Sequence, residues 1–189
     1  MDLGRCDVRE EELGLDHCLT FVRGLTAGEV ASRLGAAETG RVRGLEQLPA
    51  GSPWLAVADL PGGAVIVEAI RGRLTFAEAY GPVSRGTSVA VVYESEHNDP
   101  AFLWVSDGEV RVSFDPGSAG WRTGREPDAL LADMVELGFD LSGNGEFDPD
   151  AEFDEDAEVR ALALAERVTG LRLHAGMLRE LTYLVLQPR

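Results

Sequence analysis

Two tight-turn signals, each set between two apolar segments, constrain the fold of this 189-residue chain more than any other feature. The paired segments are WLAVADL (54–60) with AVIVEAI (64–70), and AFLWVSD (101–107) with EVRVSFD (109–115). The first pair is joined by Pro-Gly-Gly and the second by Asp-Gly, which favours the type I′ turn of a β-hairpin. In 109–115, apolar and polar residues alternate, as in a strand with one wet face. The chain is therefore expected to build an antiparallel sheet from hairpins.

Two more segments, CLTFVRGL (18–25) and SVAVVYES (88–95), have the β-branched composition of strands, and YLVLQ near the C-terminus is a further candidate. Residues 36–53 contain Gly and Pro punctuation and are expected to be loop. A sheet with an apolar face needs a cover, which helices supply in mixed folds. The expected fold class is α+β, a mostly antiparallel five- or six-stranded sheet with helices packed on one face, in a single domain over residues 1–189.

The helices are predicted from the signals at their ends. Thr26 and Glu29 fit a capping box, in which side chains satisfy the free amides of a helix start, and Gly35 can take the left-handed conformation that ends a helix. The other expected helices are 127–139, with Pro127 at or near its first position, 157–170, ending at Gly170, and short ones at 74–80 and near 176–181.

The charge of the chain limits the classes of partner that it can bind. All 17 basic residues are arginine, which is typical of a high-GC bacterial genome, and 33 acids bring the formal net charge to −16. Such a chain is repelled by nucleic acids and membrane surfaces, so neither is an expected partner. Nine of the acids and no base lie in 140–158, so more than half of the net charge sits in one connection.

The sequence also indicates the cellular compartment of the protein. No apolar run approaches the ~20 residues of a membrane-spanning helix, and the N-terminus MDLGRCDVREEELG lacks the apolar centre of a secretory signal. A cytoplasmic protein is expected, in which Cys6 and Cys18 stay free thiols.

Three segments, CLTFVRGLTAGEVASRLGA, VRVSFDP and ALALAERVTGLRL, resemble in order and spacing a bacterial domain-of-unknown-function family that is common in high-GC soil bacteria. The likeness covers most of residues 15–175. The segments are apolar and structural, and the family has no established activity, so the resemblance implies kinship but no functional residue. The acidic stretch is longer than in the family pattern, which marks it as a loop insertion at about 140–157.

The acidic stretch begins like a calcium-binding loop, which has oxygen ligands at positions 1, 3 and 5, glycine at 6 and a bidentate Glu at 12. Gly145 falls at position 6, but position 12 is Ala151, and the nearest Glu comes one residue late. The candidate metal ligands are Asp140, Ser142, Asn144, Asp148 and Glu152. The missing Glu favours the alternative, a mobile acidic loop that holds calcium no tighter than about millimolar.

One short polar cluster, EHND (96–99), is a candidate for catalysis. Glu96, His97 and Asp99 could form an acid–base group at the tip of a hairpin. Asn, Asp and Pro are also the residues that turns use, because their side chains or rings fit the turn backbone. A plain turn is the favoured interpretation, and no catalytic residue is assigned.

The other histidine with a reactive neighbour is His17, which adjoins Cys18. Because neighbours on a strand face opposite sides, we expect a surface histidine beside a buried cysteine rather than a catalytic dyad. Together with Cys6 these residues lack the paired spacing of a zinc site. The sequence also contains no glycine-rich phosphate loop, so no cofactor-binding residue is assigned.

Trp121, Arg122 and Arg125 in GSAGWRTGRE (117–126) are candidate partner-binding residues. An exposed tryptophan with arginine is the kind of anchor that dominates protein interfaces. The favoured interpretation, however, is that Trp121 folds back over the sheet edge as a lid, because tryptophan is usually largely buried.

These observations support three hypotheses of function. The favoured one is a small acidic protein-binding module, of the immunity or antitoxin type, that inhibits a basic protein partner, since acidic surfaces capture basic partners fast. The second is a calcium-responsive module working through the 140–152 loop. The third is an enzyme of unknown class that uses Glu96, His97 and Asp99. Apart from weak calcium binding, no cofactor is expected.

Overall fold

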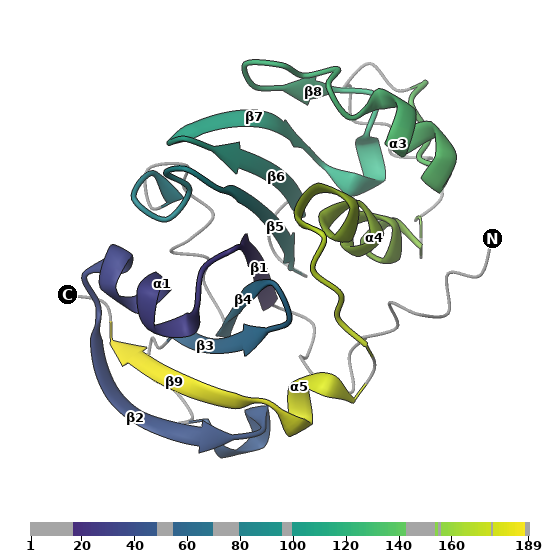
Figure 1. Ribbon diagram of the computed structural model, residues 1–189. Helices are drawn as coiled ribbons and strands as arrows, with labels where there is room; N and C mark the ends of the chain where they lie inside the picture. Colours follow the sequence, from purple (N-terminus) through teal and green to yellow (C-terminus); the bar gives the residue numbers. More distant parts are fainter. Residues whose placement is uncertain are drawn as a thin grey trace.

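The structure, a computed structural model, describes residues 17–48, 55–69, 80–95, 100–142, 154, 156–174 and 176–187. These residues form one nine-stranded sheet in the order β2-β9-β3-β4-β1-β5-β6-β7-β8, shown in Figure 1. Every neighbouring pair is antiparallel. The strands are β1 (His17–Arg23), β2 (Ala37–Arg43), β3 (Leu55–Leu60), β4 (Gly63–Ala69), β5 (Ser88–Glu94), β6 (Ala101–Ser106), β7 (Glu109–Phe114), β8 (Arg122–Thr123) and β9 (Thr182–Gln187).

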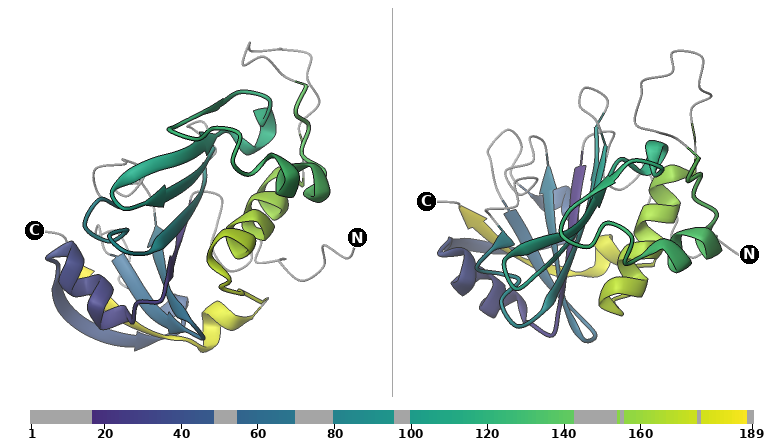
Figure 2. Two further views of the ribbon diagram at one scale, coloured as in Figure 1. Left: turned by 45° about the horizontal axis from the view of Figure 1, so that its top comes forward. Right: turned by 90° about the horizontal axis from the view of Figure 1, so that it is seen from above.

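Short helices connect and cover the strands. The α-helices are α1 (Ala27–Leu34), α3 (Leu131–Leu137), α4 (Ala157–Thr169) and α5 (Met177–Glu180), with 3₁₀ turns η1 (Leu45–Gln47) and η3 (Pro116–Ser118). Figure 2 shows α1 and α4 on opposite sides of the sheet. None of the helices in the described part of the chain combines the length and the apolar character needed to cross a bilayer.

The expected sheet of five or six strands with helices on one face is wrong in both respects. The sheet has nine strands among the described residues, and helices cover both of its faces. Strand β2 lies inside 36–53, which was expected to be loop, and β8 has only two residues. Because β2 is an edge strand whose side chains are mostly solvated, it lacks the apolar alternation that identifies a half-buried strand.

The two faces of the sheet carry two separate apolar clusters. On one face, Val30 of α1 packs with Val57 and Ile66 of the central strands. On the other, α3, α4 and α5 cover a cluster that includes Phe21 and Leu164. A sheet covered on both faces needs apolar side chains at successive positions, which explains the continuous apolar runs of β3 and β5.

The local signals of turns and helix ends are confirmed. Thr26 N donates to Glu29 Oε2 over 2.8 Å, and Glu29 N donates to Thr26 Oγ1 over 3.3 Å, which completes the capping box of α1. Gly35 ends that helix with φ 62°. Asp107 and Gly108 have φ 52° and 80°, the two positive values that a type I′ turn requires.

The helix expected at 127–139 is shorter in the structure, where α3 covers only Leu131–Leu137. Residues 127–130 instead form a turn, with Ala129 N donating to Glu126 O over 3.0 Å. Asp128 is held by the guanidinium of Arg122 at 3.1 Å, so this turn is tied to the preceding loop. The turn and the ion pair at Asp128 occupy the residues where the end signals placed the first turn of the helix.

Candidate functional site: a braced tryptophan loop

The side chain of Trp121 points into solvent with 59 % of its area exposed, so the interpretation of this residue as a lid over the sheet edge is wrong. Among the described residues, Trp121 and Val135 of α3 are the only large apolar side chains that are exposed. Val135 lies in α3, and Trp121 directly precedes β8. Figure 1 shows β7, β8 and α3 together at one end of the sheet. Exposed apolar groups scattered singly are common, so the question is how Trp121 is held.

Trp121 ends a compact turn within the connection from β7 to α3, residues 115–128, which we call the Trp121 loop. Asp115 accepts a hydrogen bond from Gly117 N over 2.8 Å and so caps the 3₁₀ turn η3. Ser118 N donates to Asp115 O over 2.9 Å, and Trp121 N donates to Ser118 O over 3.1 Å. These successive bonds fix the backbone up to the tryptophan itself.

Arg122 braces the loop from inside. Its Nη1 donates to the carbonyl oxygens of Ala119 and Gly120, and its Nη2 lies 3.1 Å from Asp128 Oδ1. Only 13 % of the Arg122 side chain is exposed. The structure therefore directs this arginine into the loop, where it joins the residues before and after Trp121.

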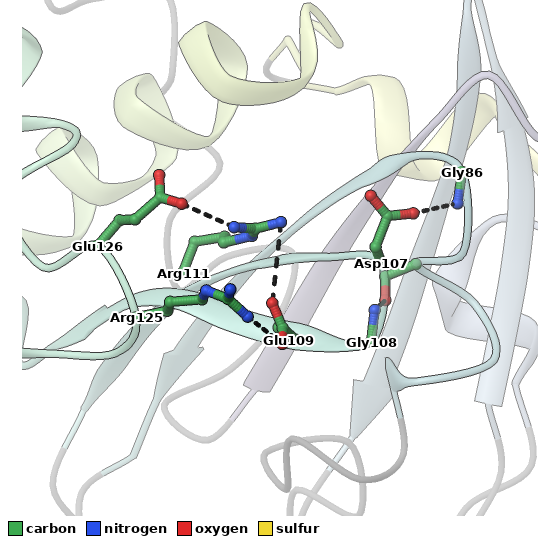
Figure 3. A network of polar contacts seen from close by, with 8 residues as sticks. Gly86, Asp107, Gly108, Glu109, Arg111, Arg125 and Glu126 are labelled. Carbon is green, nitrogen blue, oxygen red and sulfur yellow. Dashed lines mark hydrogen bonds and ion pairs between the residues drawn. The ribbon is translucent and has the colours of Figure 1, made fainter.

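The second half of the loop is fastened to β7, as Figure 3 shows. Arg111 of β7 binds Glu126 over 2.7 Å and lies 3.9 Å from Glu109, which also pairs with Arg125. The backbone nitrogens of Arg125 and Glu126 donate to the carbonyls of Val110 and Arg111 over 3.0 and 2.9 Å. The loop thus covers the outer edge of β7 and hides its free backbone groups.

Gly124 is the residue that allows this close approach. Its φ is 112°, and a Cβ atom added there would lie 2.5 Å from the carbonyl oxygen of Arg111. A side chain at position 124 would collide with the backbone of Arg111. Relieving this collision would require the Trp121 loop to move away from β7. The glycine therefore fixes how closely the Trp121 loop lies against β7.

The hairpin beneath the loop is itself braced at its tip, as the right-hand side of Figure 3 shows. Gly86 N donates to Asp107 Oδ1 over 2.8 Å, and Gly108 N donates to Ser84 Oγ over 2.9 Å. The turn that follows residue 80 is therefore joined to the tip of the β6–β7 hairpin. A rigid hairpin gives the Trp121 loop a fixed support.

The surroundings of Trp121 are acidic. Residues 107–136 contain seven acidic and three basic side chains, all described by the structure. Each of the three arginines is paired with a carboxylate of the same stretch. The positive charge is thus neutralised locally. Arg167 of α4 also pairs with Asp133 and Glu136, so the seven acids exceed the arginines that bind them by three.

The structure separates His17 from Cys18, as expected for neighbours on a strand. Cys18 lies on the face covered by α1, where burial raises the pKa of its thiol to about 12 and the nearby charge of Glu68 adds to the increase. A thiol with so high a pKa is a poor nucleophile. The expectation of a surface histidine is wrong, because only 3 % of His17 is exposed and its Nε2 lies 2.9 Å from Glu158 Oε1 of α4.

Of the candidate calcium ligands, the structure describes Asp140 and Ser142. Asp140 Oδ1 accepts hydrogen bonds from Ser142 N over 2.9 Å and from Ser142 Oγ over 2.7 Å, and these bonds lower the pKa of the Asp140 carboxyl. Within the described segments, no three His, Cys, Asp or Glu side chains are grouped so as to hold a metal ion. The remaining candidates, Asn144, Asp148 and Glu152, lie outside the described residues.

The acid–base candidates Glu96, His97 and Asp99 also lie outside the described residues, as do the helix expected at 74–80 (except Tyr80) and most of the acidic loop. The calcium-responsive and enzymatic hypotheses therefore stay predictions. Sequence reasoning missed the carboxylates of Glu94 and Glu158 around His17. No local pattern could have found them, since Glu158 is 141 residues from His17.

The fold and the loop define a protein built on one broad antiparallel sheet that displays a braced tryptophan at one end. The chain matches the model of a family of unknown function (DUF6461) over residues 6–187, and it belongs to this family. This confirms the resemblance to a family without an assigned activity. A comparison with curated proteins and one with solved structures find no significant match.

Proposed function

We propose that this protein is a cytoplasmic protein-binding module of the immunity or antitoxin type, which captures a basic protein partner through the Trp121 loop. The observation that carries the proposal is the exposed indole of Trp121 on a loop braced on both sides. Tryptophan is the residue type most enriched among the side chains that dominate binding energy.

Preorganisation favours this function. The loop is already ordered by Arg122, Gly124 and the bonds to β7, so a partner does not have to immobilise it. Burying the exposed 59 % of an indole with roughly 200 Å² of surface, at ~25 cal/mol/Å², contributes about 3 kcal/mol. A contribution of that size corresponds to roughly a hundredfold in Kd.

Charge supports the choice of a basic partner. A chain with net charge −16 attracts basic proteins over distances near the Debye length, about 8 Å at physiological salt. Such attraction raises the association rate more than it slows dissociation. Association should therefore slow steeply as salt rises, and an association rate indifferent to salt would remove electrostatic capture from the proposal.

The experiment is affinity capture from the native host with three baits, namely wild type, Trp121→Ala and Arg41→Ala. Arg41 is a matched control, since its side chain is 65 % exposed on β2, at the other edge of the sheet. A captured protein supports the proposal when it is basic and the Arg41→Ala bait captures it as well. Its Kd for purified Trp121→Ala should also be at least thirtyfold higher than its Kd for wild type. An acidic partner, or one bound equally by wild type and Trp121→Ala, would overturn it.

A further inference from the structure

The two edges of the sheet differ in how the chain covers them. The Trp121 loop lies along β7 near one edge and binds its backbone. At the other edge, β2 is the last strand in the described part of the chain, as Figure 1 shows. Helix α1 packs over β3, β4 and β9, which lie farther inside the sheet. A strand in the position of β2 presents N–H and C=O groups on which a further strand can pair.

The register of β2 with β9 shows which of its backbone groups point outward. Gly44 N donates to the carbonyl oxygen of Leu181, the residue before β9, over 3.0 Å. Backbone groups of successive residues in a strand point to opposite sides, so the odd-numbered residues of β9 face β2 and the even-numbered ones face β3. Glu38 and Arg41 lie opposite even-numbered residues of β9. Their N–H and C=O groups therefore point away from β9.

A bulge in β2 spaces these outward groups evenly. The register shifts between Glu38 and Gly40, which makes Thr39 an extra residue. Positions 38 and 41 consequently lie opposite alternate residues of β9 and have the spacing of alternate residues in a regular strand. The bulge also places both side chains on one face, where Arg41 Nε lies 2.9 Å from Glu38 Oε1. Both are exposed, Arg41 to 65 % and Glu38 to 45 %.

These two positions are complementary to themselves about a two-fold axis. When two β2 strands run antiparallel with Glu38 of one opposite Arg41 of the other, Arg41 of the first also lies opposite Glu38 of the second. Each such pair can exchange two backbone hydrogen bonds and places opposite charges across from each other, which stabilises the pairing. Registers that place Arg41 opposite Arg41 or Arg43 set like charges against each other and are disfavoured. The charges of β2 therefore favour one register.

We propose that the protein forms a two-fold dimer in which the β2 strands of two copies pair antiparallel, with Glu38 of each copy opposite Arg41 of the other. The two sheets then join into one, through an interface made of the same strand in both copies. The Trp121 loops lie near the opposite edges, so the dimer displays two of them at its ends. The dimer does not depend on the proposed function and is tested on the protein alone.

The first test measures the mass in solution by analytical ultracentrifugation, over the micromolar range at physiological salt, where screening limits the repulsion between two copies of charge −16. Wild type should reach twice the 20.3 kDa of one chain. Glu38→Arg and Arg41→Glu should each raise the Kd of the dimer at least tenfold, because the two-fold axis places every substitution twice in the interface. An equal mixture of these two variants should dimerise like wild type, since one copy then presents two positive charges and the other two negative ones.

The matched control makes the same two charge changes at an ion pair of α4. Glu166→Arg and Arg172→Glu break a pair with 2.6 Å between Arg172 Nε and Glu166 Oε1, and each should leave the Kd of the dimer unchanged. A monomeric wild type, a mixture that stays monomeric, or a dimer indifferent to the changes at Glu38 and Arg41 would overturn the proposal. The mixture excludes a role confined to one chain, because neither variant keeps its own Glu38–Arg41 pair.

The second test follows amide hydrogen exchange of two neighbours in wild-type β2. The N–H of Arg41 points outward and is bonded only in the dimer, whereas that of Val42 points to β9 in every copy. Dilution from dimer to monomer should speed exchange of the Arg41 amide at least tenfold and leave that of Val42 unchanged. An Arg41 amide protected equally in monomer and dimer, or in neither, would contradict the pairing.

Discussion

Replacing Gly124 by alanine tests whether close approach to β7 holds the Trp121 loop. The added Cβ would lie 2.5 Å from the carbonyl oxygen of Arg111. A non-glycine residue at φ 112° costs about 1–3 kcal/mol by backbone strain alone. Moving the chain away to relieve the collision would break two backbone bonds to β7, each worth about 0.5–1.5 kcal/mol. The expected loss in the free energy of unfolding is therefore about 2–6 kcal/mol.

Gly138→Ala is the matched control. Gly138 has φ 82°, yet an added Cβ there meets no atom within 4 Å. This substitution keeps the backbone strain and lacks the collision, so its expected cost is about 1–2 kcal/mol. The difference between the two variants isolates the contact of the loop with β7.

The measurement is urea unfolding of wild type and both variants, with thermal unfolding beside it. For a chain of this length each kcal/mol lowers Tm by about 2–4 °C, so the Tm of Gly124→Ala should fall by roughly 4–24 °C. The two amides that cover β7, those of Arg125 and Glu126, should lose exchange protection in Gly124→Ala but not in Gly138→Ala. Equal losses of stability in the two variants, or a change at Gly124 below about 0.5 kcal/mol, would refute the reasoning.

Three further outcomes are expected. Glu94→Gln should stabilise the protein at neutral pH. Burial raises the pKa of the Glu94 carboxyl, so its ionisation costs stability once the pH exceeds the pKa of this group in the unfolded chain. Urea midpoints that shift equally at pH 4 and pH 7.5 would contradict this prediction. The thiol of Cys18, with its pKa raised to about 12, should resist a thiol reagent at pH 8 in a Cys6→Ser background until the protein unfolds, and labelling of the native protein within minutes would argue against its burial. Calorimetry should give calcium binding no tighter than about millimolar, little changed by Asp140→Ala with Asn144→Ala, whereas micromolar one-to-one binding abolished by that pair would establish a defined site.

The features that were predicted correctly depend on residues close together in the chain. The hairpin at Asp107-Gly108 follows from the positive φ values that these two residues tolerate. The capping box of Thr26 and Glu29 closes over three residues, and Gly170 ends α4 by its own conformation. Such interactions need no knowledge of the rest of the fold, so one sequence suffices to predict them.

The features that were missed depend on partners far along the chain. Strand β2 is a strand because β9 pairs with it, with Val42 opposite Tyr183, and nothing within 36–53 indicates that pairing. His17 is buried because α4 covers it and places Glu158 against it. The local sequence at position 17 shows only a polar residue beside a cysteine, which does not indicate this burial. The turn at Asp107-Gly108, the cap at Thr26 and the end of α4 at Gly170 were determined by the sequence alone. The number of strands, the burial of His17 and the exposure of Trp121 were decided only by packing, because side-chain environment is a property of the assembled sheet.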